Sequence, residues 1–463
     1  MFVNRETELA FLEGRYRSSQ AELVVLYGRR RVGKTDLLHQ FCQDKPHVFF
    51  VADLGTAETN LVQFSRAVSQ HVHGDPEVEG VYRDWDQGLA RLARLAQDER
   101  FVAVFDEFTY LVSTQLGITS TLQRVWDETL RRTQIMLILC GSYVGMMMQH
   151  VLDYRAPLYG RRTGDWYLQP FAFQEATSLL AWLPREDQLR AYAVLGGMPA
   201  YLVALNPHWG LLENIEHRVL QRGTFLHNEP RLLLQSELRD PTNYFSVLEA
   251  IASGATRPSE IAQRAGLPLS ALTYYLNNLR DLGLVERAVP ATEPRPERSR
   301  RAFYHLADGF FRFWFRYVLP NRSLLERGQT EPVVRKVATE LDTYTGPVFE
   351  DVCREQVWRL SETGQLPFTV RRVGGWWSRT AEVDLCAVGD EDILLGECKW
   401  WAGPVGLNVL DGLRARAGEV ARATGHLRPH LSLFARNGFT PEVEAVARTE
   451  GVLLFDFRRW PWV

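Results

Sequence analysis

The order of hydrophobic and polar positions divides the chain into three kinds of segment. Short apolar runs that end in polar residues occur within 21–43, 47–54, 101–108 and 135–143, and this pattern is typical of buried strands. From 172 to about 235 the apolar residues recur at i, i+3 and i+4, which predicts helices. Strand-like runs return near the C-terminal end. We therefore expect an α/β region, a helical region and a second α/β region.

A further pattern lies between the helical region and the second α/β region. It consists of a helix at 244–253, a short helix that starts at Pro258, a glycine turn at Gly266 and a helix at 269–283. Two short apolar runs, LVERAVP and RAFYHL, follow these helices and resemble the two strands of a wing. This order predicts a winged helix-turn-helix, in which the third helix can enter a major groove.

Composition limits the class of protein. The chain has 463 residues, 46% of them hydrophobic and 24% charged, which is typical of a folded protein with two to four domains. A net charge of −3 gives no overall affinity for polyanions, so any nucleic-acid binding must come from local patches. We expect a cytoplasmic protein without a membrane span, because there is no signal-like or spanning apolar run. The five cysteines have no C-x-x-C spacing, which favours reduced thiols (Cys42, Cys140, Cys353, Cys386, Cys398).

The loop inside 21–43 matches G-x-x-x-x-G-K-[ST], with Gly28, Gly33, Lys34 and Thr35 at the defining positions. A strand precedes this loop and a helix follows it, which is the context of a phosphate-binding loop rather than of a chance glycine-rich turn. Lys34 can reach the β- and γ-phosphates of ATP, and the Thr35 hydroxyl can bind Mg²⁺. The sequence therefore predicts an ATP site.

The run at 101–108 ends in two carboxylates. Asp106 fits the residue that binds Mg²⁺ through water, and Glu107 fits the base that polarises the attacking water. The alternative is an acidic pair that only caps a strand. The run at 47–54 lies between the two motif strands in the sequence, so we expect them not to be neighbours in the sheet, as in the additional-strand, catalytic-glutamate NTPases.

Two later segments add candidates around the nucleotide. Ser142 ends the run at 135–143 and could sense the γ-phosphate. Arg161 and Arg162 precede the next strand, and either could act as an arginine finger toward a phosphate in a neighbouring subunit of a homo-oligomer. The alternative is that a local carboxylate binds each arginine.

The first 200 or so residues resemble the archaeal-type ATPases of the AAA+/STAND group. The resemblance rests on several motifs in family order: FVNRETELAFL, GRRRVGKT, VFDEF, LCGSYVGMM, PLYGRRT and GGMPAYL. It implies that the N-terminal segment lies against the adenine, with Phe2, Val3 and Arg5 as contacts. It also implies a nucleotide contact from a helical lid at the GGMP segment, where Pro199 lies.

DNA is the expected partner of the winged helix. The exposed face of its third helix is predicted to carry Ser270, Thr273, Tyr274, Asn277 and Arg280. The wing loop 291–302 contains four arginines that could bind the phosphate backbone: Arg295, Arg298, Arg300 and Arg301. The alternative is a winged helix that packs on the ATPase or on a partner and never contacts DNA.

The C-terminal region carries charge at the ends of apolar runs. Asp384 lies in one run, and Glu397 and Lys399 lie two positions apart in the next, so these two share one strand face. The order α, β, β, β, α, β with these residues resembles the PD-(D/E)XK nuclease core. The resemblance implies that Asp384 and Glu397 bind Mg²⁺, that Lys399 stabilises developing charge, and that Glu350 on the preceding helix is an auxiliary acid. The alternative is an inactive fold in which Glu397 and Lys399 form an ion pair.

The expected protein is thus α/β, with four consecutive domains. They are a RecA-like P-loop ATPase core (1–170), a helical lid (171–238), a winged helix-turn-helix (239–310) and a restriction-endonuclease-like α/β domain (311–463). The first function hypothesis is an ATP-driven enzyme that cleaves DNA in prokaryotic defence or genome maintenance. The alternatives are a nucleotide-controlled signalling switch with an inactive nuclease fold, and a transcription regulator.

Overall fold

The computed structural model describes all residues except 1, 116, 239, 426 and 461–463. By internal packing these residues form two units. The first contains Met1–Pro170 with Met198–Ala200, and the second contains Phe171–Gly197 with Tyr201–Val463. Within the described residues, no helix is long and apolar enough to cross a membrane.

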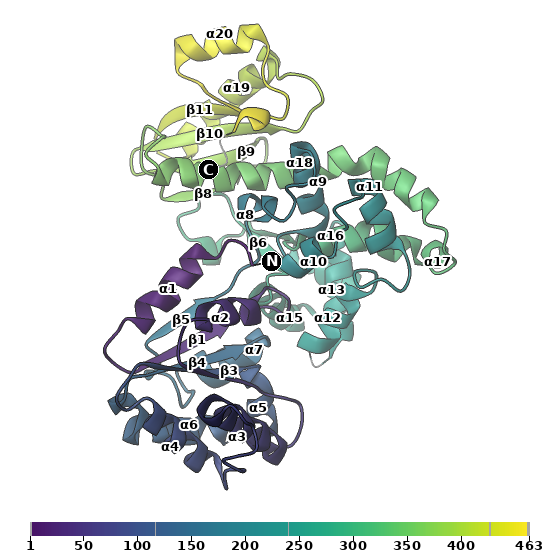
Figure 1. Cartoon of the computed structure of the whole chain (residues 1–463). Coiled ribbons are helices and arrows are strands. Elements are labelled where there is room, and N and C mark those ends of the chain that lie inside the picture. Colours follow the sequence, from purple (N-terminus) through teal and green to yellow (C-terminus); the bar gives the residue numbers. More distant parts are fainter. Residues whose placement is uncertain (1, 116, 239, 426, 461–463) are drawn as a thin grey trace. The chain divides into compact units, whose positions relative to one another are not determined.

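A parallel five-stranded sheet, in the order β2-β3-β4-β1-β5, is the centre of the first unit (Figure 1). Its strands are β1 (Glu22–Tyr27), β2 (His47–Val51), β3 (Phe101–Asp106), β4 (Ile135–Gly141) and β5 (Gly164–Tyr167). The two motif strands β1 and β3 are not neighbours, as predicted. The strand that separates them is β4, whereas β2, which lies between them in the sequence, is at the edge of the sheet.

Helices cover both faces of this sheet. One face packs against α3, α4, α5 and α6 through a continuous apolar core, and α2, the crossover from β1 to β2, lies on the other face with α1 (Figure 1). The helices are α1 (Glu6–Tyr16), α2 (Lys34–Cys42), α3 (Ala57–His73), α4 (Trp85–Leu95), α5 (Phe108–Thr114), α6 (Ile118–Glu128), η1 (Leu130–Arg132), α7 (Val144–Met147) and η2 (Met148–Leu152). With both faces covered, the strands are buried, and this explains their continuous apolar runs.

The second unit begins with the predicted helical region. Its helices are α8 (Phe173–Thr177), α9 (Arg185–Leu195), α10 (Pro199–Val203), α11 (Leu211–Asn214), η3 (Ile215–Leu220) and α12 (Glu229–Glu237). The Gly196–Gly197 pair ends α9. Gly196 has a φ of +67°, and a Cβ on Gly197 would lie 1.7 Å from the Phe171 carbonyl oxygen, so only glycine fits this close approach.

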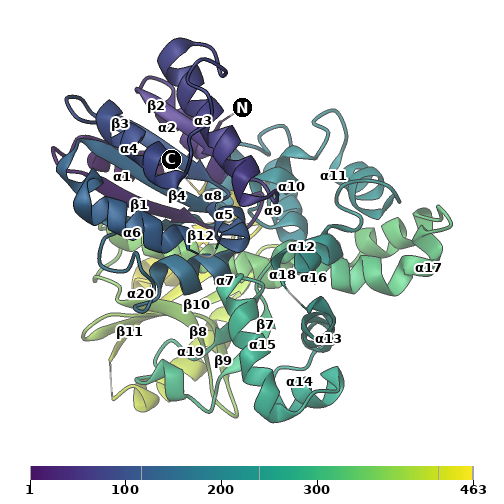
Figure 2. The same ribbon diagram turned by 90° about the horizontal axis from the view of Figure 1, so that it is seen from below.

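The winged helix has the predicted elements (Figure 2). They are α13 (Pro241–Ala252), α14 (Pro258–Ala265), α15 (Leu269–Asp281) and the antiparallel strands β6 (Val285–Ala288) and β7 (Phe303–Leu306), with η4 (Pro296–Arg298) in the wing. Gly266 follows α14 in the left-handed conformation, as a turn glycine should.

A long helix, α18 (Glu331–Glu362), connects the winged helix to the C-terminal sheet. Before it come α16 (Gly309–Phe313), η5 (Trp314–Val318), η6 (Leu319–Asn321) and α17 (Arg322–Leu325). A proline normally marks a helix start, because it has no N–H for the helical hydrogen bond. Here Pro347 is inside the helix, and buried side chains such as Leu341 and Phe349 hold both sides of it against the protein.

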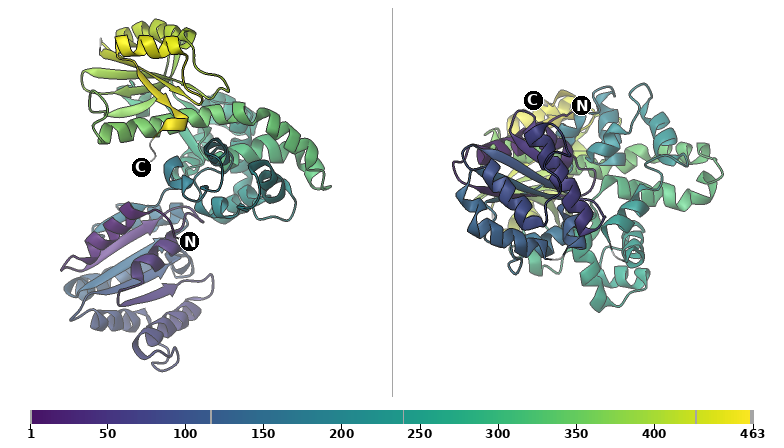
Figure 3. Two further views of the ribbon diagram at one scale, coloured as in Figure 1. Left: turned by 45° about the horizontal axis from the view of Figure 1, so that its top comes forward. Right: turned by 60° about the horizontal axis from the view of Figure 1, so that its bottom comes forward.

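The C-terminal sheet has five strands in the order β12-β11-β10-β9-β8, antiparallel among β8, β9 and β10 and parallel from β10 to β12. The elements are β8 (Arg372–Trp377), β9 (Glu382–Val388), β10 (Asp392–Lys399), α19 (Leu407–Ala423), β11 (Arg428–Ala435), α20 (Pro441–Glu450), β12 (Leu453–Asp456) and η7 (Phe457–Arg459). The predicted order is present, with α20 as an unpredicted helix between the last two strands. In Figure 3 α18 lies on one side of this sheet and α19 and α20 on the other.

Candidate nucleotide-binding and acidic sites

The phosphate-binding loop lies between β1 and α2, at the carboxyl end of the parallel sheet. Gly33 has a φ of +92°, and a Cβ on Gly28 would lie 2.5 Å from the Leu168 carbonyl oxygen, so both positions require glycine. The Lys34 ammonium is buried and donates to the carbonyl oxygens of Gly28 (2.8 Å) and Arg29 (3.0 Å). The cation is thus held inside the loop, where a phosphate would exchange for these carbonyls.

Thr35 and Asp106 meet beside this loop. The Thr35 hydroxyl donates to Asp106 Oδ2 at 2.7 Å, and the other oxygen of Asp106 accepts from the Glu107 backbone N–H at 2.9 Å. A hydroxyl and a buried carboxylate in contact are hard oxygen donors, so this pair fits the needs of Mg²⁺. The two residues come from elements that are not adjacent in sequence, and the sheet brings them together as predicted.

Glu107 lies at the start of α5 with a φ of +49°, a strained conformation for a residue with a side chain. One of its carboxylate oxygens accepts from the Ser142 hydroxyl at 2.8 Å. The other oxygen is buried and has no hydrogen-bond partner among the described residues. An unpartnered carboxylate oxygen beside the loop is what a base that binds the attacking water requires.

Arg5 is buried and connects the N-terminal segment to the nucleotide loop. Its guanidinium donates to Glu8 (2.9 Å), to the Val32 carbonyl oxygen (3.1 Å) and to the Gln169 carbonyl oxygen (2.9 Å). These bonds make it a brace between α1, the phosphate-binding loop and the segment after β5. Phe2 and Val3 are half-buried next to it, and Pro199 begins α10. Their contact with adenine stays a prediction.

Arg161 lies at the end of the sheet opposite to the phosphate-binding loop of its own chain, near the amino ends of the strands. The neighbouring Thr163 N–H donates to the carbonyl oxygen of Leu23, at the amino end of β1, whereas the loop leaves the carboxyl end. The Arg161 guanidinium binds Asp127, with a shortest distance of 2.8 Å. It lines a pocket of about 710 Å³ together with Arg131 and Arg132. Arg161 therefore does not contribute to the nucleotide site of its own chain.

Arg162 is also bound locally. It donates to the Leu152 carbonyl oxygen at 3.2 Å and lies 3.3 Å from an Asp165 carboxylate oxygen. Both arginines thus contact local carboxylates, which is the alternative that the sequence left open. A role for either of them in a second subunit stays a prediction.

The acidic cluster of the C-terminal sheet contains Asp384 on β9 and Glu397 and Lys399 at the end of β10. The Lys399 ammonium lies 3.1 Å from Asp384 Oδ2 and 2.8 Å from Glu397 Oε1, so one cation bridges both carboxylates. Arg416 on α19 binds the second oxygen of Glu397. The Cys398 backbone N–H donates to Asp384 at 2.9 Å. The sequence could not identify Arg416, because α19 carries several arginines and only the packing selects one.

Glu350 approaches the cluster from α18. Burial, and then the charge of Asp384, raise the pKa of Glu350 to about 8. The same two causes, in the same order, raise the pKa of Glu397. Burial lowers the pKa of Lys399, but the two carboxylates outweigh it, so this pKa is raised overall. Arg354, another residue that the sequence did not reveal, joins Glu350 (3.3 Å) to the Asp384 carbonyl oxygen (2.6 Å).

The metal-binding capacity of this cluster is limited by the position of Lys399. In the part of the chain that the structure describes, no group of three or more His, Cys, Asp or Glu side chains is arranged to hold a metal ion. Asp384 and Glu397 form a pair, with the ammonium between them. Two carboxylates this close together nevertheless suit a divalent cation, because its positive charge would relieve the repulsion between them.

In the winged helix, the outer face of α15 is exposed, whereas part of the wing is covered by the C-terminal sheet. The five residues predicted for the outer face of α15 are all exposed: Ser270, Thr273, Tyr274, Asn277 and Arg280. The wing packs on β8 of the C-terminal sheet. The Ala291 N–H donates to the Gly375 carbonyl oxygen (2.9 Å), and the Trp377 indole donates to the Arg301 carbonyl oxygen (3.1 Å).

The wing arginines differ in their surroundings. The Arg301 side chain pairs with Glu293 at 3.0 Å, so its charge is compensated within the wing. Arg295, Arg298 and Arg300 are exposed. The predicted basic patch is therefore smaller than four arginines, because one of them stabilises the loop.

Comparison with known proteins identifies the family. Residues 2–205 match an ATPase domain predominantly from Archaea. An uncharacterized protein of Methanocaldococcus jannaschii is 35% identical over 403 residues, which cover 86% of this chain and 88% of that protein. The chain belongs to this family of archaeal-type ATPases. Residues 242–288 of the ATPase match the IclR helix-turn-helix domain, which confirms the predicted helix-turn-helix.

Two further known proteins have narrower or weaker similarity to this archaeal-type ATPase. An uncharacterized ATP-binding protein of M. jannaschii is 56% identical over 45 residues, which are 10% of this chain and 76% of that protein. The solved Walker-type ATPase of Pyrococcus abyssi has a TM-score of 0.49 and 22% identity, and the match covers 68% of this chain and 96% of that chain. Residues 314–408 match archaeal and bacterial proteins of unknown function, so this match assigns no activity to the C-terminal region.

The nucleotide site predicts the outcome of two substitutions. Lys34→Ala should abolish ATP binding, because it removes the cation held within the loop. Glu107→Gln should keep ATP binding and the Ser142 contact but lower hydrolysis by about 100-fold or more, because an amide cannot accept a proton from water. Binding of a fluorescent ATP analogue and phosphate release, measured separately, test both. Turnover of Glu107→Gln at the rate of the unchanged protein would contradict the assignment of Glu107.

Proposed function

We propose that this ATPase couples its nucleotide state to DNA binding by the winged helix and to metal-dependent DNA cleavage by the C-terminal domain. Such an activity fits prokaryotic defence or genome maintenance. The observation that carries the cleavage part is the convergence of Asp384, Glu397 and Lys399 at the carboxyl end of β10. A buried Glu397 and a half-buried Asp384 with an adjacent lysine have the charges that hydrolysis of a phosphodiester requires.

In the ATPase unit, the roles follow from the contacts. Lys34 neutralises the phosphates, since its ammonium already lies among the carbonyls of the loop. Thr35 and Asp106 would hold Mg²⁺, which neutralises the charge that develops on the phosphates. Glu107 holds the attacking water through its unpartnered oxygen, while Ser142 fixes the other oxygen.

In the C-terminal domain, Asp384 and Glu397 would hold Mg²⁺, and the ion would supply a Lewis acid at the scissile phosphate. Lys399 would stabilise the negative charge that develops when a water oxygen bonds to phosphorus and the bond to the leaving sugar oxygen breaks. Glu350 would serve as the auxiliary acid, because its raised pKa keeps a proton available near neutral pH. Arg416 orients Glu397 and Arg354 orients Glu350.

The second candidate function is a nucleotide-controlled switch with an inactive C-terminal scaffold. The observation that favours it is the ion pairing itself, because Lys399 occupies the space between the two carboxylates. A transcription regulator, which needs only the ATPase and the winged helix, is the third. The observation against both alternatives is the position of Glu350 next to Asp384, where burial and then the charge of Asp384 raise the pKa of Glu350 to about 8.

The proposed homo-oligomer predicts a rescue experiment. Arg161→Ala should bind ATP normally and hydrolyse it about 1,000-fold more slowly, because an arginine finger stabilises the transition state from a neighbouring subunit. A mixture with Lys34→Ala should regain part of the turnover, since each variant supplies what the other lacks. Arg155→Ala, an exposed arginine in the same segment, is the matched control. Absence of rescue at every mixing ratio would leave Arg161 with only its bond to Asp127.

The winged helix predicts a graded loss of DNA affinity. The double substitution Arg298→Ala with Arg300→Ala should weaken binding to all DNA sequences. The slope of log affinity against log salt concentration (the salt slope) should fall in magnitude by about two, one for each phosphate contact removed. Asn277→Ala on α15 should instead reduce discrimination between sequences. Arg335→Ala on α18, also exposed, should change neither. Unchanged affinity and salt slope in the double variant would mean that the wing serves only to pack on β8.

The acidic cluster predicts metal-dependent cleavage. Cutting of DNA should require Mg²⁺ or Mn²⁺ and should fail with Ca²⁺, which prefers larger and looser oxygen cages. Asp384→Ala, Glu397→Ala and Lys399→Ala should each abolish cutting and leave ATP hydrolysis intact. A cleavage assay on plasmid, linear duplex and single-stranded DNA across metals, with and without ATP, measures this.

Glu391→Ala is the matched control for the cleavage assay. Glu391 is an exposed acid in the turn before β10, so its loss removes the same charge without touching the cluster. Cutting that survives Glu397→Ala, or the absence of cutting under every condition, would reject the nuclease and favour the scaffold.

A further inference from the structure

Two consecutive tryptophans follow the cluster lysine and have opposite environments. Trp400 is 5% exposed, whereas Trp401 is 46% exposed. The Lys399 ammonium lies 5.9 Å from the centroid of the Trp401 ring. Through Lys399, a large exposed aromatic surface is thus adjacent to Asp384 and Glu397.

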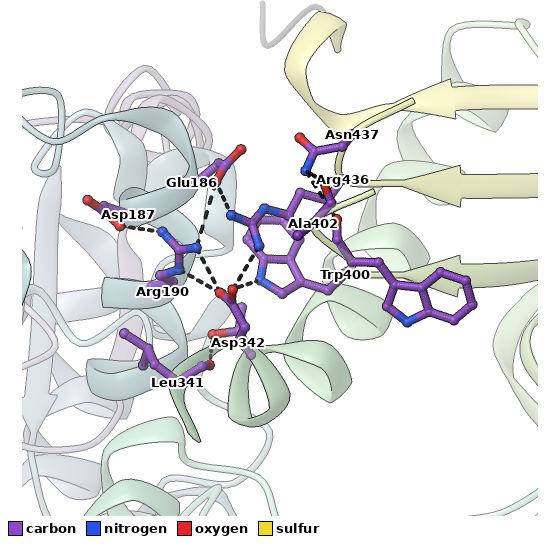
Figure 4. Close-up of polar contacts among 11 residues, drawn as sticks. Glu186, Asp187, Arg190, Leu341, Asp342, Trp400, Ala402, Arg436 and Asn437 are labelled. Atoms are coloured by element: carbon purple, nitrogen blue, oxygen red, sulfur yellow. Dashed lines mark hydrogen bonds and ion pairs between the residues drawn. The ribbon is translucent and has the colours of Figure 1, made fainter. Parts of the chain in front are cut away.

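The backbone that carries Trp401 is held from several sides, as Figure 4 shows for the residues around it. The Trp400 indole donates to Asp342 at 3.2 Å, and the Arg436 guanidinium lies 4.9 Å above the Trp400 ring. The Asn437 amide donates to the carbonyl oxygens of Trp401 (3.2 Å) and Ala402 (2.7 Å). The exposed ring is therefore presented on a rigid support.

Nothing in the described part of the chain stacks on the ring of Trp401. Its recorded ring contact is the one with Lys399, and the buried aromatic contacts of this loop belong to Trp400 instead. A tryptophan face on an anchored backbone, next to a cation and two carboxylates, presents one apolar, planar surface and one polar site side by side. A nucleotide has the same two parts, a planar base and a charged phosphate.

We propose that Trp401 is a stacking platform for an unpaired nucleobase, and that the C-terminal domain takes single-stranded DNA, or an unpaired DNA end, as its substrate. A base in a continuous duplex has both faces covered by its neighbours, so only an unpaired base can offer a face to Trp401. Stacking there would place the adjoining phosphate near Lys399. This inference rests on the proposed nuclease function and adds the substrate class to it.

The test uses the full-length protein in Ca²⁺, with an oligonucleotide that contains the fluorescent base 2-aminopurine, as a single strand and as a duplex. The fluorescence of the single strand should be quenched by stacking on Trp401, whereas that of the duplex should not, although the winged helix can bind the duplex. Trp401→Ala should weaken single-strand binding by about 5- to 150-fold and remove the quenching. Trp401→Phe should retain most of both, since it keeps a ring. ATP hydrolysis should stay unchanged in each variant.

Trp358→Ala is the matched control, because Trp358 is a tryptophan of similar exposure (39%) on α18. It should bind and quench like the unchanged protein. Quenching that is lost in Trp401→Ala, without any cleavage by the unchanged protein, would retain the platform and reject the nuclease. Cleavage and single-strand binding that survive Trp401→Ala would retain the nuclease and overturn the platform, as would equal losses on single strand and duplex.

Discussion

Charge placed at the ends of apolar strands is the physical constraint on which both units depend. A buried charge without a partner costs several kcal/mol, so each one must be compensated by an opposite charge or by hydrogen bonds. In the ATPase unit, Lys34 is compensated by carbonyl oxygens and Asp106 by the Thr35 hydroxyl and a backbone N–H. In the C-terminal sheet, Lys399 and Arg416 compensate Asp384 and Glu397. In both arrangements the charges are compensated by groups that a bound phosphate or cation could replace.

The two sites differ in how much of their charge is left unbalanced. At the nucleotide site, one buried carboxylate oxygen of Glu107 has no hydrogen-bond partner among the described residues. At the C-terminal site, Glu350 is an additional half-buried carboxyl group; burial and then the charge of Asp384 raise its pKa, although Arg354 pairs with it at 3.3 Å. A buried polar atom without a partner, or a carboxyl group whose ionisation is disfavoured, costs free energy in the folded protein. A ligand that pairs with such a group recovers part of this free energy on binding. Both features agree with the ligand binding that we propose for the two sites.

The second unit is held together by contacts between its parts. The wing packs on β8, which fixes the winged helix to the edge of the C-terminal sheet and leaves α15 exposed. On another side, Asp342 of α18 accepts from Arg190 of α9 (2.8 Å) and from Arg436 after β11 (2.9 Å), as Figure 4 shows. Through these contacts the helical region, α18 and the C-terminal sheet share one ion network.

The sequence by itself determined the elements whose signal is local. The glycine loop with Lys34, the acidic end of β3, the helix-turn-helix and the alternation of Glu397 with Lys399 follow from short-range rules of turn geometry and periodicity. Only the tertiary structure decided what depends on long-range packing. It placed β4 rather than β2 between the motif strands, and it placed Arg161 at the end of the sheet opposite to the phosphate-binding loop. It also continued α18 through Pro347 and brought Arg416 and Arg354 to the acidic residues. The identity of a charged residue in the sequence does not reveal its interaction partner, because that partner is brought near only by the folding of distant segments.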